Sequence, residues 1–174
     1  GINKMKNNSE DLIHILKEKS PLAGQLADYE ILELIQLMPL HSYRENETIL
    51  AKGEPASSLM FLISGSVNIH LNDHLIAKLT QGAVFGEGMF SNQGKRIADA
   101  VTVEPTDVLL FDLSTYESLL RKNSEVALKC KLIFEKLYKQ NSLANENFFT
   151  KDSAKYLALV AHNEMKKSLV SFVQ

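Results

Sequence analysis

The spacing of apolar residues along the chain changes from helical to strand-like near residue 41. Over residues 9–19 and 28–38 the apolar side chains recur every three or four positions, the spacing of an amphipathic helix. Pro21 and Pro39 follow these segments, and proline cannot continue a helix. After residue 41 the period falls to two, which predicts short strands. We expect these strands at residues 48–51, 59–64, 66–71, 75–79 and 107–112.

Turn-forming residues separate the predicted strands. The clearest hairpin has its turn at Asn72-Asp73, and the odd-numbered apolar residues of the preceding strand share one face. Short strands with such turns between them are typical of an antiparallel roll or barrel. We therefore predict a mainly β fold with flanking helices. Residues 85–101 interrupt the strands, and a long insertion in a tight roll is usually functional.

The helical spacing returns after residue 112. Ser114 and Glu117 fit a capping box, which predicts a helix from there to about Arg121. A second helix is predicted over residues 124–140, and its apolar residues form a narrow seam that suits either the roll or a partner helix. We favour the roll, because the seam covers too few heptads for a coiled coil. The seam residues are Ala127, Cys130, Phe134 and Leu137.

The last part of the chain has a different character. Residues 141–154 are polar and predict a linker after a first domain of residues 1–140. Residues 156–161 form an unbroken apolar run, which fits a strand buried on both faces, as in a parallel sheet. A helical stretch follows at 164–173. The remaining residues supply no partner for such a strand, so we expect residues 155–174 to be the truncated start of a second domain.

Composition narrows the functional classes. The chain has 174 residues, of which 45% are hydrophobic and 23% charged, as in soluble globular proteins. Its net charge of −2 provides no basic field for nucleic acid. One cysteine excludes an internal disulfide and fits a reducing compartment. No apolar run reaches membrane-spanning length, so we expect a cytoplasmic location with no nucleic acid and no membrane as partners.

Residues 85–101 contain the strongest candidate site. Gly86 and Gly88 allow the backbone to approach a ligand closely. Glu87 lies within this turn, and its carboxylate suits the hydroxyls of a sugar. Arg96 can clamp a phosphate with two parallel hydrogen bonds, and backbone N–H groups can complete the cradle. The pattern indicates a ribose and a phosphate held side by side; the alternative is a surface ion pair of Glu87 and Arg96 worth under about 1 kcal/mol.

Several spaced motifs strengthen the nucleotide interpretation: RENETI at residues 44–49 with Gly53-Glu54, LMFLISGSV at 59–67, FGE at 85–87 and RIA at 96–98. With these motifs, residues 12–140 resemble the cyclic-nucleotide-binding domain family of catabolite-activator-type regulators and kinase regulatory subunits. The resemblance implies an antiparallel β-roll similar to a double-stranded jelly roll, with a phosphate-binding cassette at residues 85–101. It also implies that the helix ending near Gln140 acts as a movable lid.

The resemblance assigns roles within the cassette. Glu87 would bind the ribose 2′-hydroxyl and Arg96 the cyclic phosphate. The backbone amides of Gly86, Met89, Ile97 and Ala98 would complete the cradle, and the remaining ligand-binding positions are Phe85 and Gly88.

Two of these positions depart from the family. Ile97 replaces a small or hydroxyl-bearing residue, so it crowds the phosphate and lacks the hydroxyl that often favours guanine; we expect cAMP rather than cGMP. Gly88 replaces an apolar residue, which loosens the local helix by up to about 1 kcal/mol.

The tail has a resemblance of its own. The sequence KYLALVAHN at residues 155–163, with Lys166, is similar to the opening strand and phosphate-side turn of methylglyoxal synthase, which converts dihydroxyacetone phosphate to methylglyoxal. By this resemblance His162 and Lys166 line a substrate-phosphate site, while the catalytic carboxylates of that family are absent here. The alternative is a generic buried strand that ends in a polar turn.

Two other features carry less weight. His70, Asp73 and His74 surround a predicted hairpin tip and suggest a metal site, but side chains at such a tip are solvated, so we predict no metal and no cofactor. Cys130 is expected to be a buried small hydrophobe rather than a nucleophile.

We therefore predict a regulatory domain that senses a cyclic nucleotide and controls a C-terminal enzyme domain, with no catalytic residues in this fragment. One alternative is a nucleotide-independent β-roll dimerisation module, with the helix of residues 124–140 as a homo-oligomer interface. Another is the sensor domain of a Crp-type transcription regulator, which would need a helix-turn-helix after the lid helix.

Overall fold

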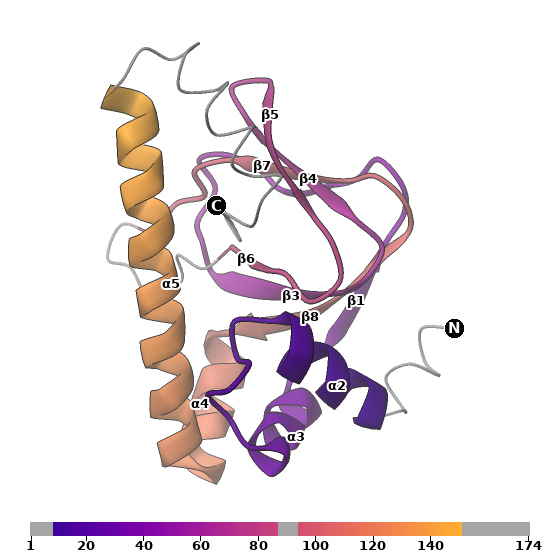
Figure 1. Cartoon of the computed structure of the whole chain (residues 1–174), viewed down its shortest axis with the longest axis vertical. Helices are drawn as coiled ribbons and strands as arrows, with labels where there is room; N and C mark the ends of the chain where they lie inside the picture. Colours follow the sequence, from indigo (N-terminus) through magenta and orange to yellow (C-terminus); the bar gives the residue numbers. More distant parts are fainter. Residues whose placement is uncertain (1–8, 87–93, 151–174) are drawn as a thin grey trace.

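The computed structural model of the chain describes residues 9–86 and 94–150, with side chains as far as Asn141. Figure 1 shows a β-roll with helices packed below it and a long helix along one side. The helices are α2 (Ser9–Lys19), α3 (Asp28–Leu37), α4 (Leu113–Lys122) and α5 (Ser124–Thr150). The predicted mainly β roll with flanking helices is confirmed. No helix in the described part of the chain is long and apolar enough to cross a membrane.

Two four-stranded antiparallel sheets form the roll, with strand orders β1-β8-β3-β6 and β2-β7-β4-β5. The hairpin of β4 and β5 has its turn at Asn72 and Asp73, as predicted, and both residues have positive φ. The strands are β1 (Leu40–Tyr43), β2 (Thr48–Leu50), β3 (Ser58–Ser64), β4 (Val67–Leu71), β5 (His74–Leu79), β6 (Val84–Phe85), β7 (Asp99–Thr102) and β8 (Thr106–Asp112).

Strand β3 is buried on both faces, which explains its unbroken apolar sequence. Phe61 and its odd-numbered neighbours in β3 belong to a core cluster shared with all four helices. Met60 and Leu62 belong to a second cluster, which fills the interior of the roll between the two sheets. The domain therefore has two hydrophobic cores separated by one sheet.

The apolar seam of α5 packs on this sheet, as we favoured. The Phe134 ring makes edge-on contacts with Phe61 and Phe111, at centroid distances of 6.0 and 5.1 Å. The other seam residues, Ala127, Cys130 and Leu137, are buried in the same cluster. Burial raises the pKa of the Cys130 thiol to about 12, so this side chain is a buried hydrophobe, as predicted.

Three short strands, β1, β6 and β7, were missing from the prediction. Strands of two to four residues are too short for an alternating pattern to stand out, and they pair with segments far away in the chain, as Leu40 does with Leu109. Strands β6 and β7 lie partly inside residues 85–101, so this stretch is less of an insertion than expected.

Two helix ends also correct the prediction. The N-cap of α4 is Asp112, whose side chain accepts a hydrogen bond from the Thr115 N–H at 2.8 Å, because β8 runs directly into the helix and places Ser114 inside the first turn. Helix α5 continues to Thr150, where we expected a linker from Asn141. Residues 141–150 contain no proline or glycine that would end it.

Candidate functional site

The candidate site lies where β6 leaves the first sheet and the chain returns toward β7. Phe85 ends β6 with its side chain in the roll core, and Gly86 follows it. The next described residue is Gly94, and Arg96 stands between it and β7. Glu87, Gly88 and Met89 lie outside the described residues, as do His162 and Lys166 of the tail. The geometry of the site is therefore built on Gly86, Arg96 and their contacts.

Arg96 is held through its backbone. Its N–H donates to the Glu54 carbonyl oxygen at 2.7 Å, and its own carbonyl accepts from the Gly53 N–H at 2.8 Å. The turn at Gly53-Glu54, which belongs to one of the sequence motifs, thus fixes the loop that carries the arginine. This role was not predicted, because it depends on a contact between two distant segments.

The Arg96 side chain is buried, with 8% of the residue exposed. One terminal nitrogen, Nη1, donates to the Gly86 carbonyl at 2.8 Å, and the other, Nη2, donates to the Ser58 hydroxyl at 3.3 Å. An oxygen from the start of β3 and one from the residue after β6 therefore orient the guanidinium plane.

Gly86 has a positive φ and closely approaches a neighbouring side chain, and both features favour glycine. Its φ is +80°, in the left-handed region, and a Cβ atom built on it would lie 2.6 Å from Nη1 of Arg96. The sequence predicted a glycine that lets backbone approach a ligand; the structure shows that the backbone of Gly86 also approaches the arginine.

The residues after Arg96 differ in exposure. Ile97 is 46% exposed, so the side chain that departs from the family pattern lies at the surface beside the buried arginine. Ala98 is half-buried and packs against the roll core. Their predicted roles as amide donors to a phosphate stay predictions.

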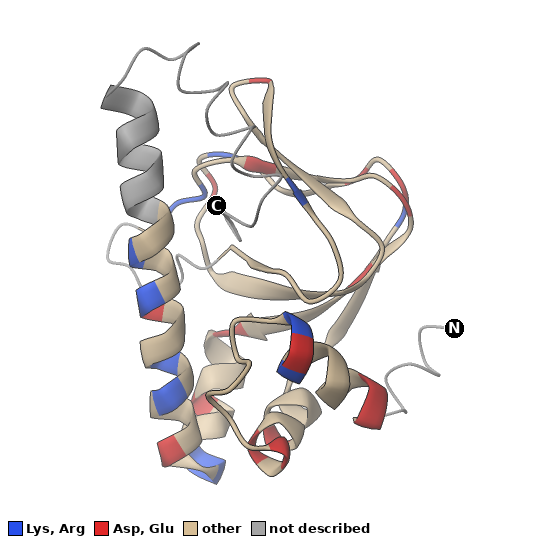
Figure 2. Cartoon of the chain, viewed as in Figure 1, with Lys and Arg blue, Asp and Glu red and all other residues tan. Residues whose placement is uncertain are grey.

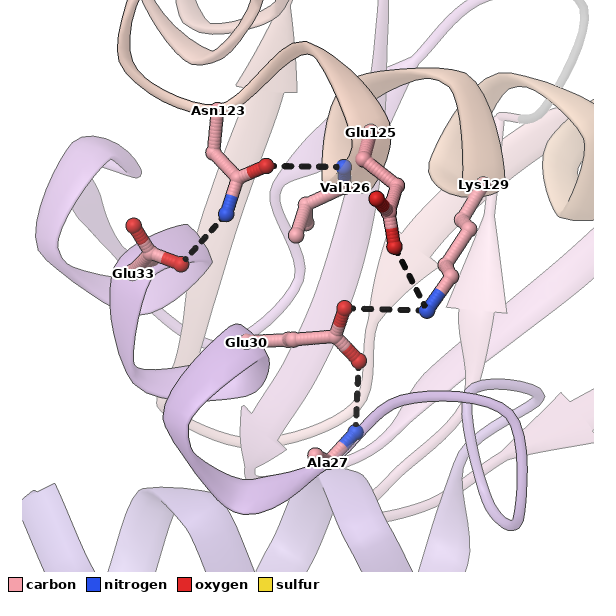
Figure 3. A network of polar contacts seen from close by, with 7 residues as sticks. All are labelled: Ala27, Glu30, Glu33, Asn123, Glu125, Val126 and Lys129. Carbon is pink, nitrogen blue, oxygen red and sulfur yellow. Dashed lines mark hydrogen bonds and ion pairs between the residues drawn. The ribbon is translucent and has the colours of Figure 1, made fainter.

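The N-terminal part of α5 is joined to α3 by a polar network, shown in Figure 3. The Glu30 carboxylate accepts a hydrogen bond from the Ala27 N–H at 2.8 Å and contacts the Lys129 ammonium at 3.0 Å. These bonds lower the pKa of Glu30, the Ala27 bond most strongly, although burial opposes them. The network ties α5 to the N-terminal helices and was not predicted from the sequence.

Asn123 connects α4 and α5 at the same place. Its backbone N–H donates a hydrogen bond to the Leu119 carbonyl at the end of α4. Its side-chain oxygen accepts a hydrogen bond from the Val126 N–H in the first turn of α5, at 3.3 Å. Its side-chain nitrogen donates to Glu33 of α3 at 3.0 Å. The junction between the two helices is thus fixed by one residue that three helices share.

Figure 2 shows both basic and acidic residues along α5, so the charges on this helix are of mixed sign. No group of three His, Cys, Asp or Glu residues suited to a metal ion occurs within residues 9–86 and 94–150.

Comparisons with known proteins identify a matching family model and several relatives. A family model described as "Cyclic nucleotide-binding domain" matches residues 40–123. "Cyclic AMP receptor protein" of Thermus thermophilus is 31% identical over 113 residues, which make up 62% of this chain and 52% of that protein. "Glutaminase 2" of Bradyrhizobium diazoefficiens is 33% identical over 109 residues, 62% of this chain but 17% of that protein. The chain thus spans about half or less of the length of these two relatives.

Solved structures share the fold. A cyclic nucleotide-binding domain from Methylobacillus flagellatus superimposes with a TM-score of 0.65 over 83% of each chain, at 24% identity.

Proposed function

We propose that the chain binds cAMP, in preference to cGMP, at residues 85–98 and transmits its occupancy to another domain, because a model of the cyclic nucleotide-binding domain family matches residues 40–123. The observation that carries this proposal is the buried Arg96, held by its backbone and oriented by two oxygens at a site where the family binds a phosphate. Guanidinium groups bind phosphates with charge-assisted bidentate hydrogen bonds.

The preference for cAMP rests on Ile97 and on the relatives. The side chain after Arg96 is an exposed aliphatic group without the hydroxyl that often favours guanine. One of the relatives is named as a cyclic AMP receptor. Glu87, which would bind the ribose hydroxyl, is the second residue on which the proposal depends.

The proposed output is regulation of an enzyme domain in the same protein. In the glutaminase relative, the segment that matches this chain makes up 17% of a protein named as an enzyme. This supports a fusion of the domain to an enzyme without identifying the enzyme here. That the regulated domain is similar to methylglyoxal synthase stays a prediction, based on His162 and Lys166. We expect no turnover of dihydroxyacetone phosphate by this chain, and formation of methylglyoxal would contradict that.

The proposed mechanism is a shift in the position of α5. Nucleotide binding would order the cassette and favour one seating of the lid helix over another, and the difference in affinity between the two seatings sets the maximum regulation. The junction at Asn123 and the Glu30–Lys129 contact are the polar contacts that hold α5 to the rest of the domain, in addition to its packed apolar seam.

The test is a calorimetric titration with cAMP and cGMP on the wild type and Arg96→Ala. We expect the substitution to cost about 2–4 kcal/mol of binding free energy, because it deletes charge-assisted bonds to the phosphate. Arg121→Ala is the matched control, since Arg121 is an exposed arginine on α4 and should leave affinity unchanged.

The outcomes separate the candidate functions. Unchanged affinity in Arg96→Ala would show that the arginine is not the phosphate clamp. No binding of either nucleotide by the wild type would favour the nucleotide-independent dimerisation module. The activator-type alternative predicts tight DNA binding in a gel shift at low salt, which we do not expect.

A further inference from the structure

We propose that Ser58 is a positioning residue for the ligand: its hydroxyl, together with the Gly86 carbonyl, holds the Arg96 guanidinium in the orientation that meets the cyclic phosphate. This inference rests on the proposed function of the site. Ser58 belongs to none of the motifs that pointed to a nucleotide, and it touches the site only through Arg96 in the contacts described above.

The first argument is the geometry of the arginine. Its two terminal nitrogens are each bonded to a different oxygen, Nη1 to Gly86 at 2.8 Å and Nη2 to Ser58 at 3.3 Å. Bonds at both terminal nitrogens restrict rotation of the guanidinium plane more than a bond at one of them would. A side chain that is already ordered loses less conformational entropy when it binds a phosphate.

The second argument is burial. Ser58 and Arg96 are each only 8% exposed, so water cannot freely replace the hydroxyl if it is removed. An N–H that loses a buried acceptor carries a desolvation penalty unless the side chain moves to a new partner. Removing the hydroxyl should therefore displace the guanidinium.

The third argument is that the position of Ser58 does not depend on the hydroxyl. Ser58 begins β3 and lies opposite Asp112 in the ladder with β8, so its backbone is placed by the sheet. A Cβ at position 86 would lie 3.2 Å from the Ser58 carbonyl oxygen, which shows how closely the two strand ends approach. The sheet thus presents the hydroxyl as a fixed acceptor.

The experiment compares variants that differ in the hydroxyl alone. Ser58→Thr keeps the hydroxyl and Ser58→Val replaces it with a methyl group of similar shape, and both β-branched residues suit a strand. We expect Ser58→Val and Ser58→Ala to weaken cAMP binding about three- to tenfold, and Ser58→Thr to stay within about twofold of the wild type. Ser64→Ala is the control, because Ser64 lies on the same strand and bonds Asp107 instead of the arginine.

A double-mutant cycle tests whether Ser58 acts through Arg96. In an Arg96→Ala background, Ser58→Val should cause no further loss of affinity, since there is no guanidinium left to orient. In the ligand-free protein, ¹⁵N NMR of the Arg96 side chain should show faster rotation of the Nη2 group in Ser58→Val than in Ser58→Thr.

The results distinguish this inference from the proposed function. If the wild type binds cAMP and Ser58→Val binds it equally well, or loses the same affinity with and without Arg96, Ser58 is not a positioning residue and the function stands. If the wild type binds neither nucleotide, the proposed function fails and the positioning role for the ligand fails with it.

Discussion

Arg96 and Glu30 are both buried charged residues, and the domain holds them in different ways. Arg96 lies in a loop, and the turn at Gly53-Glu54 bonds both its backbone N–H and its carbonyl. Glu30 lies on a helix, and its carboxylate shares a bond with Lys129 of another helix. The Glu30 side chain is 4% exposed and that of Lys129 is 42% exposed, so water reaches one partner of this pair.

The difference indicates which contact is rigid and which can open. A side chain fixed through backbone and two acceptors is preorganised for a ligand. When an ion pair with a partly solvated lysine separates, the ammonium is hydrated and the Glu30 carboxylate keeps the hydrogen bond from the Ala27 N–H, and the Coulomb energy of the pair is already reduced by solvent. We therefore expect substitutions around Arg96 to change ligand affinity, and substitutions around Glu30 to change stability and the seating of α5.

Among the residues that contact Arg96, the largest expected effect comes from Gly86→Ala. The added Cβ would lie 2.6 Å from Nη1 of Arg96, at a φ of +80° that alanine rarely adopts. The guanidinium must shift and lose a charge-assisted bond, so cAMP affinity should fall about 10- to 100-fold by calorimetry. Gly24→Ala is the matched control, with a φ of +74° and no atom within 4 Å, and it should leave affinity unchanged.

The next effect is on stability. Glu30→Ala should lower the free energy of unfolding by about 1–2 kcal/mol, because it removes the acceptor of the Ala27 N–H and leaves Lys129 with only the longer 3.9 Å contact to Glu125. Glu30→Gln retains an acceptor for Ala27 and should cost about 1 kcal/mol. Urea denaturation measures both values, and an unchanged midpoint in Glu30→Ala would show that the network contributes nothing.

A second acid–lysine pair provides the control for Glu30. Lys17 and Asp28 are 2.8 Å apart, about as close as Glu30 and Lys129, but their side chains are 49% and 63% exposed. Asp28→Asn should therefore leave the urea midpoint within experimental error. A loss as large as that of Glu30→Ala would mean that burial is not what distinguishes the two pairs.

Asp112→Ala should destabilise the domain by about 1 kcal/mol, the usual contribution of an N-cap side chain. Its carboxylate accepts bonds from the N–H and the hydroxyl of Thr115 at 2.8 and 3.0 Å. Ser114→Ala is the comparison, since Ser114 lies inside the helix and should have little effect on the thermal midpoint. If Ser114→Ala were the more damaging change, the capping box predicted from the sequence would be correct after all.

The smallest effect is a dependence on pH. The pKa of Glu30 is lowered in the folded protein from an ordinary value of 4.5, so the unfolded state binds the proton more readily. The stability that Glu30 contributes is present above that value and is lost as the pH falls through the folded pKa. The difference in unfolding free energy between the wild type and Glu30→Gln should therefore shrink between pH 7 and pH 3, and a constant difference would contradict the lowered pKa.

Elements with strong local patterns could be predicted from the sequence. The apolar residues of α2 and α3 recur with a clear helical period, and a proline follows each helix. The ends of both helices agree with the predicted ends to within one residue. Strand β3 was predicted from its apolar run, although the reason for the run, a core on each face, became visible only in the structure. Strands β1 and β7 depend on distant partners, so no local pattern revealed them.

The candidate site shows the same limit. Arg96 and Gly86 were predicted because their residue types carry the chemistry of phosphate binding. Ser58 was missed, since a serine at the start of a strand is common and its importance comes from a contact with an arginine 38 positions away. The roles of Glu87 and Met89 stay predictions, because both residues lie outside the described part of the chain.

The pairing of β8 with both β1 and β3 also has a consequence for the order of events during synthesis. The helix-facing side of this sheet is completed by β8, whose Leu109 and Phe111 lie in the same cluster as α2 and α3. Until β8 has left the ribosome, the apolar faces of the two N-terminal helices lack much of their cover. Non-local pairing of this kind is slow to form and leaves apolar surface exposed in the meantime. A nascent chain that ends before Asp112 should therefore be a better substrate for chaperones than one released after α5.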